Sequence, residues 1–197
     1  MRGVSLSVFS STESAAPVHL WKRAQILVAE TWAAFYPSPG GSPPTPHPIF
    51  PSGPEIHLLT MFADYRVPQI LHHLRILSYP PPLVDLLQKG VMLENGSREE
   101  VSLRAASILA VEKVRKEMVR MRRAKEKGAS RRRRGKRGDD EPVGTAEEKN
   151  ADDDISSVLI DFYLWDLARR IEDGIDEVEG IETAEMLPIH RTRSTWY

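Results

Sequence analysis

The segment from Thr60 to Leu71 places an acid, a phenol and a guanidinium in a row, at Asp64, Tyr65 and Arg66, shortly before a proline. Proline is well tolerated in the first turn of a helix, and it favours extended backbone at the residue that precedes it. We therefore predict that Asp64 lies in the loop directly before a helix. At that position the positive end of the helix dipole stabilises an ionised carboxylate, the form that can support a developing cation or activate water.

The same segment also has a purely structural interpretation. Acids that precede helices commonly accept hydrogen bonds from the first backbone N–H groups, so Asp64 could act only as a helix cap. Arg66 would then be its surface partner. These residues alone do not distinguish a cap from a catalytic carboxylate.

Two further groups of polar side chains interrupt segments that are otherwise apolar. They are Lys22, Arg23 and Gln25 in the first part of the chain, and Asp161, Tyr163 and Asp166 in the last part. Each group also fits a solvated helix face, and a residue such as Trp165 is common in a hydrophobic core. Taken together with Asp64, however, acids, bases and aromatic side chains in a helical protein predict a small-molecule pocket.

The spacing of apolar residues is helical in nearly every segment that could contribute to a core. Steps of three and four predict a helix over about residues 20–36, with an apolar face that includes Trp21 and Phe35. Further helices are predicted after Pro68, over about 83–89, from the capping-box sequence Ser97–Glu100 onward, and over 155–168 with Asp154 as its cap. No strand pattern of useful length occurs, so the predicted fold class is all-α.

Composition excludes several kinds of site. The chain has 197 residues, no cysteine and a formal net charge of -1. Without cysteine there are no disulfides or thiolate zinc sites, and the histidines show no metal-ligand spacing, because adjacent His72 and His73 diverge on a helix. No apolar run approaches the roughly 20 residues that a membrane helix needs, so we expect a soluble protein of the cytoplasm without membrane association.

Charged and proline-rich stretches divide the chain. Residues 1–17 are predicted to be a polar tail, and residues 18–197 one helical domain, interrupted by a loop at 37–54 and a disordered charged insertion at 125–151. Within the insertion, the basic sequence Arg131–Arg137 could bind nucleic acid or direct nuclear entry. It lacks aromatic residues on which bases could stack, so we interpret it as a solvated linker and do not expect nucleic-acid binding.

Five sequence blocks follow one another along the chain: Trp21–Trp32, Met61–Leu71, Arg98–Arg104, Leu159–Asp166 and Pro188–Tyr197. In this order they resemble the queuosine salvage family, the queuosine 5′-phosphate N-glycosylases. The blocks cover essentially all of the chain outside the tail and the two insertions. They are similar to about the C-terminal two thirds of a family member.

The resemblance implies an all-helical fold similar to helix-hairpin-helix DNA glycosylases. It also implies hydrolysis of queuosine 5′-monophosphate to queuine and ribose 5-phosphate, without a metal or an organic cofactor. By position, Asp64 matches the catalytic aspartate of the family, and Lys22 matches a lysine that contacts the 5′-phosphate. An ionised carboxylate suits this chemistry, because cleavage of a ribosidic bond develops positive charge at the anomeric carbon. The resemblance assigns six further residues to substrate binding: Tyr65, Arg66, Asp161, Trp165, His190 and Tyr197.

The chain also departs from the family pattern. Ser102 stands where the family usually has a second glutamate, and the family's N-terminal helical part has no counterpart. We therefore expect this chain, as an N-terminally truncated member, to have weak or no activity by itself. The competing hypothesis is a nonenzymatic helical scaffold that binds nucleic acid through its basic linker, in which Asp64→Ala would have no effect. The oligomeric state does not follow from the sequence.

Overall fold

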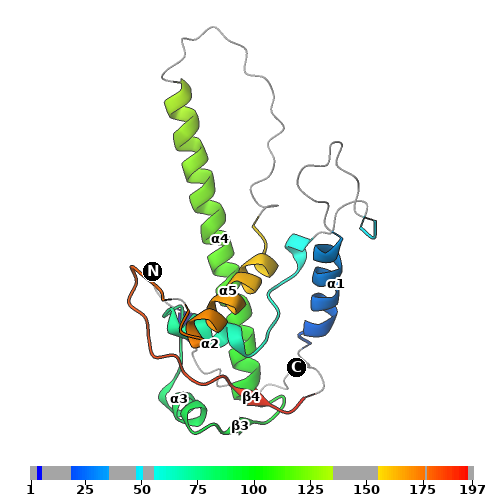
Figure 1. Cartoon of the computed structure of the whole chain (residues 1–197), viewed down its shortest axis with the longest axis vertical. Coiled ribbons are helices and arrows are strands. Elements are labelled where there is room, and N and C mark those ends of the chain that lie inside the picture. The colour runs from blue at the N-terminus through cyan, green and yellow to red at the C-terminus, as the bar shows by residue number, and fades with distance from the viewer. Residues whose placement is uncertain are drawn as a thin grey trace, which may run out of the picture.

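The computed structural model describes residues 4–5, 19–35, 48–50, 56–134, 155–175 and 177–194. These residues are mainly helical, which confirms the predicted fold class (Figure 1). The helices are α1 (Lys22–Ala34), α2 (Arg66–His73), α3 (Pro81–Gln88), α4 (Arg98–Arg134) and α5 (Ser157–Glu172), with a 3₁₀ turn, η1 (Ile56–Leu58), between α1 and α2.

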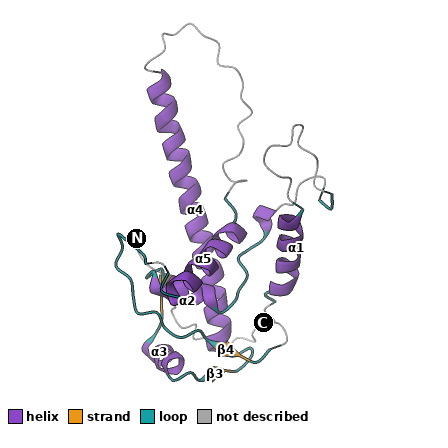
Figure 2. Ribbon diagram, in the orientation of Figure 1, coloured by secondary structure: helices purple, strands orange, loops and turns teal. Residues whose placement is uncertain are grey.

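In the part of the chain that the structure describes, the strands form only short parallel pairs (Figure 2). One pair joins β1 (Val4–Ser5) to β2 (Leu77–Ser78), and the other joins β3 (Met92–Leu93) to β4 (Arg191–Thr192). The second pair fixes the C-terminal segment beside the loop that precedes α4. The first pair shows that two residues of the predicted tail contact the body.

The main hydrophobic core forms where α2, α4 and α5 pack against one another. Each helix contributes fully buried apolar side chains, such as Leu71 from α2, Leu103 from α4 and Ala168 from α5. Burying a leucine side chain stabilises the fold by about 2 kcal/mol, so this three-helix contact is the main source of stability. As predicted, Pro68 lies in the first turn of α2, but the extended backbone predicted at Val67 is wrong, because the helix already begins at Arg66.

The apolar face predicted for the first helix is wrong at both of its ends. Trp21 and Phe35 are 70% and 51% exposed, whereas Ala29 is fully buried in a small second cluster with Ile56 and Phe62. The reason is that the side of α1 that faces the core is turned by about a quarter of a revolution from the expected stripe. Of that stripe, Trp32 still packs against the second cluster. The side that faces the core also carries Lys22 at its first turn, which brings a lysine inward.

A serine caps the N-terminus of each of the two longest helices, α4 and α5. Ser97 Oγ accepts a hydrogen bond from the backbone N–H of Glu100 at 3.3 Å, which confirms the predicted capping box at the start of α4. The carboxylate of Glu100 in turn accepts a hydrogen bond from the N–H of Gly96 at 3.2 Å. For α5 the cap is Ser156, whose Oγ accepts a hydrogen bond from the N–H of Leu159 at 3.2 Å; Asp154 lies outside the described residues.

Helix α4 extends farther than the sequence predicts. It continues to Arg134, although the disordered insertion was expected to begin at residue 125. Arginine, lysine and glutamate are good helix formers, and pairs at a spacing of four, such as Arg122 and Glu126 at 3.1 Å, add support. The rest of the insertion, and the loop at 37–54 apart from residues 48–50, lie outside the described residues. Among the helices that the structure describes, none combines the length and apolar character needed to span a bilayer.

Candidate active site

Asp64 lies directly before α2, as predicted, and its two carboxylate oxygens have different partners. Oδ1 accepts hydrogen bonds from the backbone N–H groups of Arg66, at 2.7 Å, and Val67, at 3.3 Å. Oδ2 lies 3.9 Å from Nζ of Lys22. Asp64 is therefore a helix cap through one oxygen and half of a buried ion pair through the other, so the two interpretations of the sequence are compatible.

Lys22 reaches this carboxylate from the first turn of α1. Its side chain is 9% exposed and that of Asp64 is 13% exposed, so both charges are largely removed from water. Burial lowers the pKa of Lys22, and the negative charge of Asp64 opposes that shift. Nζ also lies 5.8 Å from the centre of the Tyr65 ring, within the range of a cation–π interaction. The lysine thus forms part of a polar centre inside the protein.

A second acid, Asp161, approaches the same centre from α5. Asp161 is 4% exposed, and its Oδ1 has no hydrogen-bond partner among the described residues. Burial, reinforced by the charge of Asp64, raises the pKa of Asp161 to about 8. At neutral pH the site therefore pairs an acid that can keep its proton with a carboxylate stabilised by backbone N–H groups and a lysine. Two carboxyl groups in such different surroundings suit different roles in acid–base chemistry.

Arg104 and His190 complete the buried polar centre. Nε of Arg104 donates a hydrogen bond to the carbonyl of Ala63 at 2.9 Å, and Nη1 donates to Glu100 at 2.8 Å. Burial and the positive charges of Arg104 and Lys22 lower the pKa of His190 to about 4. His190 is thus a neutral imidazole at physiological pH. Arg104 holds the backbone immediately before Asp64.

Arg66 faces α5 and does not pair with Asp64. Its Nη1 forms an ion pair with Glu172, and its guanidinium lies 5.2 Å from the centre of the Trp165 ring. Glu172 also accepts a hydrogen bond from Nε2 of Gln69 at 2.8 Å. The predicted surface pair between Arg66 and Asp64 is therefore wrong, because α5 offers a carboxylate and an aromatic ring beside the start of α2.

The structure brings together most of the residues predicted for the site. Contacts or electrostatic interactions connect Lys22, Asp64, Tyr65, Asp161 and His190. The ring of Trp165 is 37% exposed and lies against Arg66, so it is not a core residue, and Tyr197 lies outside the described residues. Sequence reasoning missed the roles of Arg104, Glu100 and Glu172.

A usable signal existed for only some of these missed residues. Glu100 and Arg104 are four residues apart on a predicted helix, the spacing of an ion pair, but this spacing does not indicate whether the pair faces inward. Glu172 gave no such signal, because its partners are 103 and 106 positions away along the chain. Within the described ranges, no three histidine, aspartate or glutamate side chains are placed to hold a metal ion.

The buried state of Asp161 predicts a particular pH dependence of stability. An unfolded chain releases this proton near the ordinary pKa of 3.8, whereas the folded chain keeps it up to about 8, so stability falls as the pH rises through this window. The lowered pKa of His190 makes stability rise with pH up to its ordinary pKa of 6.5. This contribution is the same in the wild-type protein and in a variant at Asp161, so it cancels when the two are compared. Asp161→Asn should therefore gain about 10 °C in melting temperature relative to wild type between pH 5 and pH 8. Thermal unfolding across that range checks this, and a difference that does not vary with pH would contradict it.

The fold and the site together define a mainly helical protein with a buried centre of two acids and a lysine. Comparison with known proteins gives the family. The sequence model of the family described as "Queuosine salvage protein" matches residues 9–197, so the chain belongs to this family.

Individual relatives agree with this assignment. The chain is 35% identical over 180 residues to the queuosine 5′-phosphate N-glycosylase/hydrolase of Mus musculus, covering 91% of this chain and 41% of that protein. Proteins of the same name from Sphaerobacter thermophilus and Schizosaccharomyces pombe are 34% and 32% identical, and in each case the match covers 91% of this chain and 40% of the relative. The chain thus spans about two fifths of the length of these relatives, less than the two thirds that the resemblance suggested.

Proposed function

We propose that this chain contributes the catalytic centre for hydrolysis of the N-glycosidic bond of queuosine 5′-phosphate, which releases queuine. The names of its relatives support the reaction and the substrate. The observation that carries the proposal is the buried contact of 3.9 Å between Lys22, at the start of α1, and Asp64, in the loop before α2, beside the protonated acid Asp161. A carboxylate, a cation and a proton donor are the groups that cleavage of a ribonucleotide requires.

In the proposed reaction the bond between the anomeric carbon and the base nitrogen breaks, and the base takes the bonding electron pair. The negative charge of Asp64 stabilises the positive charge that develops on the ribose. Asp161 donates its proton to the departing base. A water molecule then adds its oxygen to the anomeric carbon, and the proton that this water loses restores Asp161.

Other residues of the site have binding roles in the proposal. Lys22 contacts the 5′-phosphate, the role that the family resemblance implies, and its buried ammonium beside Asp64 supports this role. The partly exposed ring of Trp165 offers a stacking surface for the base. Tyr65, Arg66, His190 and Tyr197 bind other parts of the nucleotide. We also propose that the fold is similar to that of helix-hairpin-helix DNA glycosylases. The mainly helical fold, with an aspartate directly before a helix, supports this similarity.

The direct test is to incubate the purified chain with queuosine 5′-monophosphate and to measure free queuine by chromatography. We expect queuine and ribose 5-phosphate in equal amounts but at a low rate, because the chain spans only about two fifths of the length of its relatives. A panel of ordinary nucleotides, assayed in parallel, separates this reaction from general nucleotide hydrolysis. Release of an ordinary base at the same rate would contradict the proposed substrate, and absence of any product would contradict the activity of this chain.

Lys22→Gln tests recognition of the phosphate. We expect KM for queuosine 5′-monophosphate to rise by about tenfold or more, since a buried, charged hydrogen-bond donor is lost. Hydrolysis of the nucleoside without phosphate should change little. Steady-state kinetics on both substrates measures the two effects.

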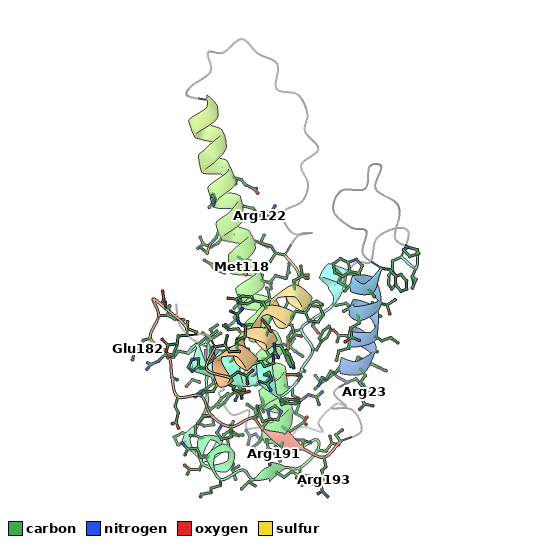
Figure 3. The ribbon with its side chains drawn as sticks, in the orientation of Figure 1. Arg23, Met118, Arg122, Glu182, Arg191 and Arg193 are labelled. Atoms are coloured by element: carbon green, nitrogen blue, oxygen red, sulfur yellow. The ribbon has the colours of Figure 1, made fainter. Side chains whose placement is uncertain are left out.

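Arg23→Gln is the matched control for Lys22→Gln. Arg23 is the next residue of α1 but is exposed, and Figure 3 shows it at the end of α1 on the side away from the core. Its substitution removes the same charge from the same turn and should leave KM for the nucleotide unchanged. Equal effects of both variants, or an equal effect on the nucleoside, would contradict a specific phosphate contact of Lys22.

A further inference from the structure

The outer half of α4 extends beyond the helical body (Figures 1 and 3). From Arg115 to Lys127 it carries seven basic and two acidic residues, a net charge of +5. One face of this segment, which we call the basic face, borders a hollow of about 500 Å³ lined by Arg115, Lys116, Val119, Arg120, Arg123, Ala124 and Lys127. The spacing of these residues is that of one side of an α-helix. None of them takes part in the site around Asp64.

The acidic tract that follows α4 has the opposite charge. From Asp139 to Asp154 the sequence contains eight acidic residues and one lysine, a net charge of -7. The structure does not describe the placement of this tract, but it does describe both ends of the connection to which the tract belongs. These ends are the last turn of α4 and the first turn of α5.

The two ends require the chain to return along α4. Ser157, the first residue of α5, donates a hydrogen bond to Glu112 of α4. At 1.5 Å per residue, Arg134 lies about 33 Å farther along the helix from Glu112, so the connection must recover that distance. Its last acids, Asp152 to Asp154, are within five residues of Ser157 and can reach up to about 17 Å from it. Lys116 and Arg120, about 6 and 12 Å from Glu112 along α4, lie inside that reach.

We propose that the basic face of α4 binds the acidic tract 139–154 of the same chain. Opposite net charges of +5 and -7 attract one another, and the tether to α5 keeps the effective concentration of the tract high. The interaction shields an unusually basic helix from other polyanions. This inference does not depend on the proposed enzymatic activity.

Other occupants fit the face less well. The segment 115–127 contains no aromatic residue on which bases of a single strand could stack. For a membrane surface, the opposite side of the helix offers Met118 and Met121 as its exposed apolar residues in this segment, which is a small area to insert. A tethered acidic segment needs neither feature.

Cysteine cross-linking tests the proposal directly, because the chain has no cysteine of its own. The first variant combines Arg123→Cys, on the basic face, with Ala151→Cys in the tract. The matched control combines Lys125→Cys, on the opposite side of the same helix turn, with Ala151→Cys. Each variant removes one positive charge from α4. The number of residues between the two cysteines is also similar in the two variants.

We expect the basic-face pair to form its disulfide about tenfold faster than the control pair at low salt. The difference should disappear in 1 M salt, where charges are screened beyond about 3 Å, and when Asp152, Asp153 and Asp154 are replaced by asparagine. Equal rates for the two pairs at low salt would overturn the proposal. If the rates are equal and the wild-type chain also binds a labelled DNA duplex, the occupant of the face is nucleic acid; without duplex binding the face is solvated.

Discussion

Asp64→Asn should reduce the rate of queuine release by about a thousandfold or more. Asparagine keeps an oxygen that can accept the hydrogen bonds of the Arg66 and Val67 N–H groups, so the cap of α2 survives. What is lost is the negative charge that the proposed mechanism places beneath the developing cation. Because an amide oxygen can replace Oδ1 as the acceptor while the charge of the whole carboxylate is lost, this single substitution separates the structural role from the chemical one.

The measurement is kcat for queuosine 5′-monophosphate, together with the melting temperature of each protein. Asp166→Asn is the matched control, since Asp166 is a half-exposed acid of α5 that pairs with Arg169 on the surface. It should leave kcat within about twofold of wild type. Turnover by Asp64→Asn near the wild-type rate would leave Asp64 as a cap only, whereas a large fall in melting temperature would attribute the lost activity to misfolding.

The loop position of Asp64 could be predicted because it depends on local chemistry. A proline is tolerated in the first turn of a helix, where its missing N–H has no intrahelical partner, so Pro68 marks the start of a helix whatever surrounds the segment. The different partners of its two oxygens could not be predicted in this way. The partner of Oδ2 is Lys22, which is 42 positions away and arrives only because α1 packs its Ala29 side against the body.

The inner face of α1 illustrates a general weakness of apolar periodicity. Two large aromatic residues, Trp21 and Phe35, dominate the apparent stripe, yet they are exposed, and the buried face carries the smaller Ala29 and the charged Lys22. Burial of a charge is unfavourable by itself, so periodicity assigns the lysine to solvent. A binding site reverses this expectation, because its charges compensate one another inside the protein. The sequence resemblance assigned Lys22 and Asp64 to one site, and the structure has their charged atoms 3.9 Å apart, whereas the apolar pattern left Lys22 on a solvated face.

Arg104→Gln should destabilise the fold by about 3–5 kcal/mol. The side chains of Arg104 and Glu100 are 7% and 2% exposed, so loss of the guanidinium leaves a carboxylate buried without its counter-charge. The carbonyl of Ala63, next to Asp64, loses its donor at the same time. For a chain of this size the expected fall in melting temperature is about 10 °C, which thermal unfolding measures.

Helix α4 supplies its own control for this prediction. Arg122 and Glu126 have the same spacing of four residues, but their side chains are 40% and 56% exposed, so Arg122→Gln should change stability by less than about 1 kcal/mol. Replacing Glu100 and Arg104 together by glutamine should be less destabilising than Arg104→Gln alone, because no uncompensated charge remains. If the double variant were the less stable of the two, the loss would come from packing and not from the ion pair. In that case the support of the Asp64 loop would depend on the shape of the Arg104 side chain and not on its charge.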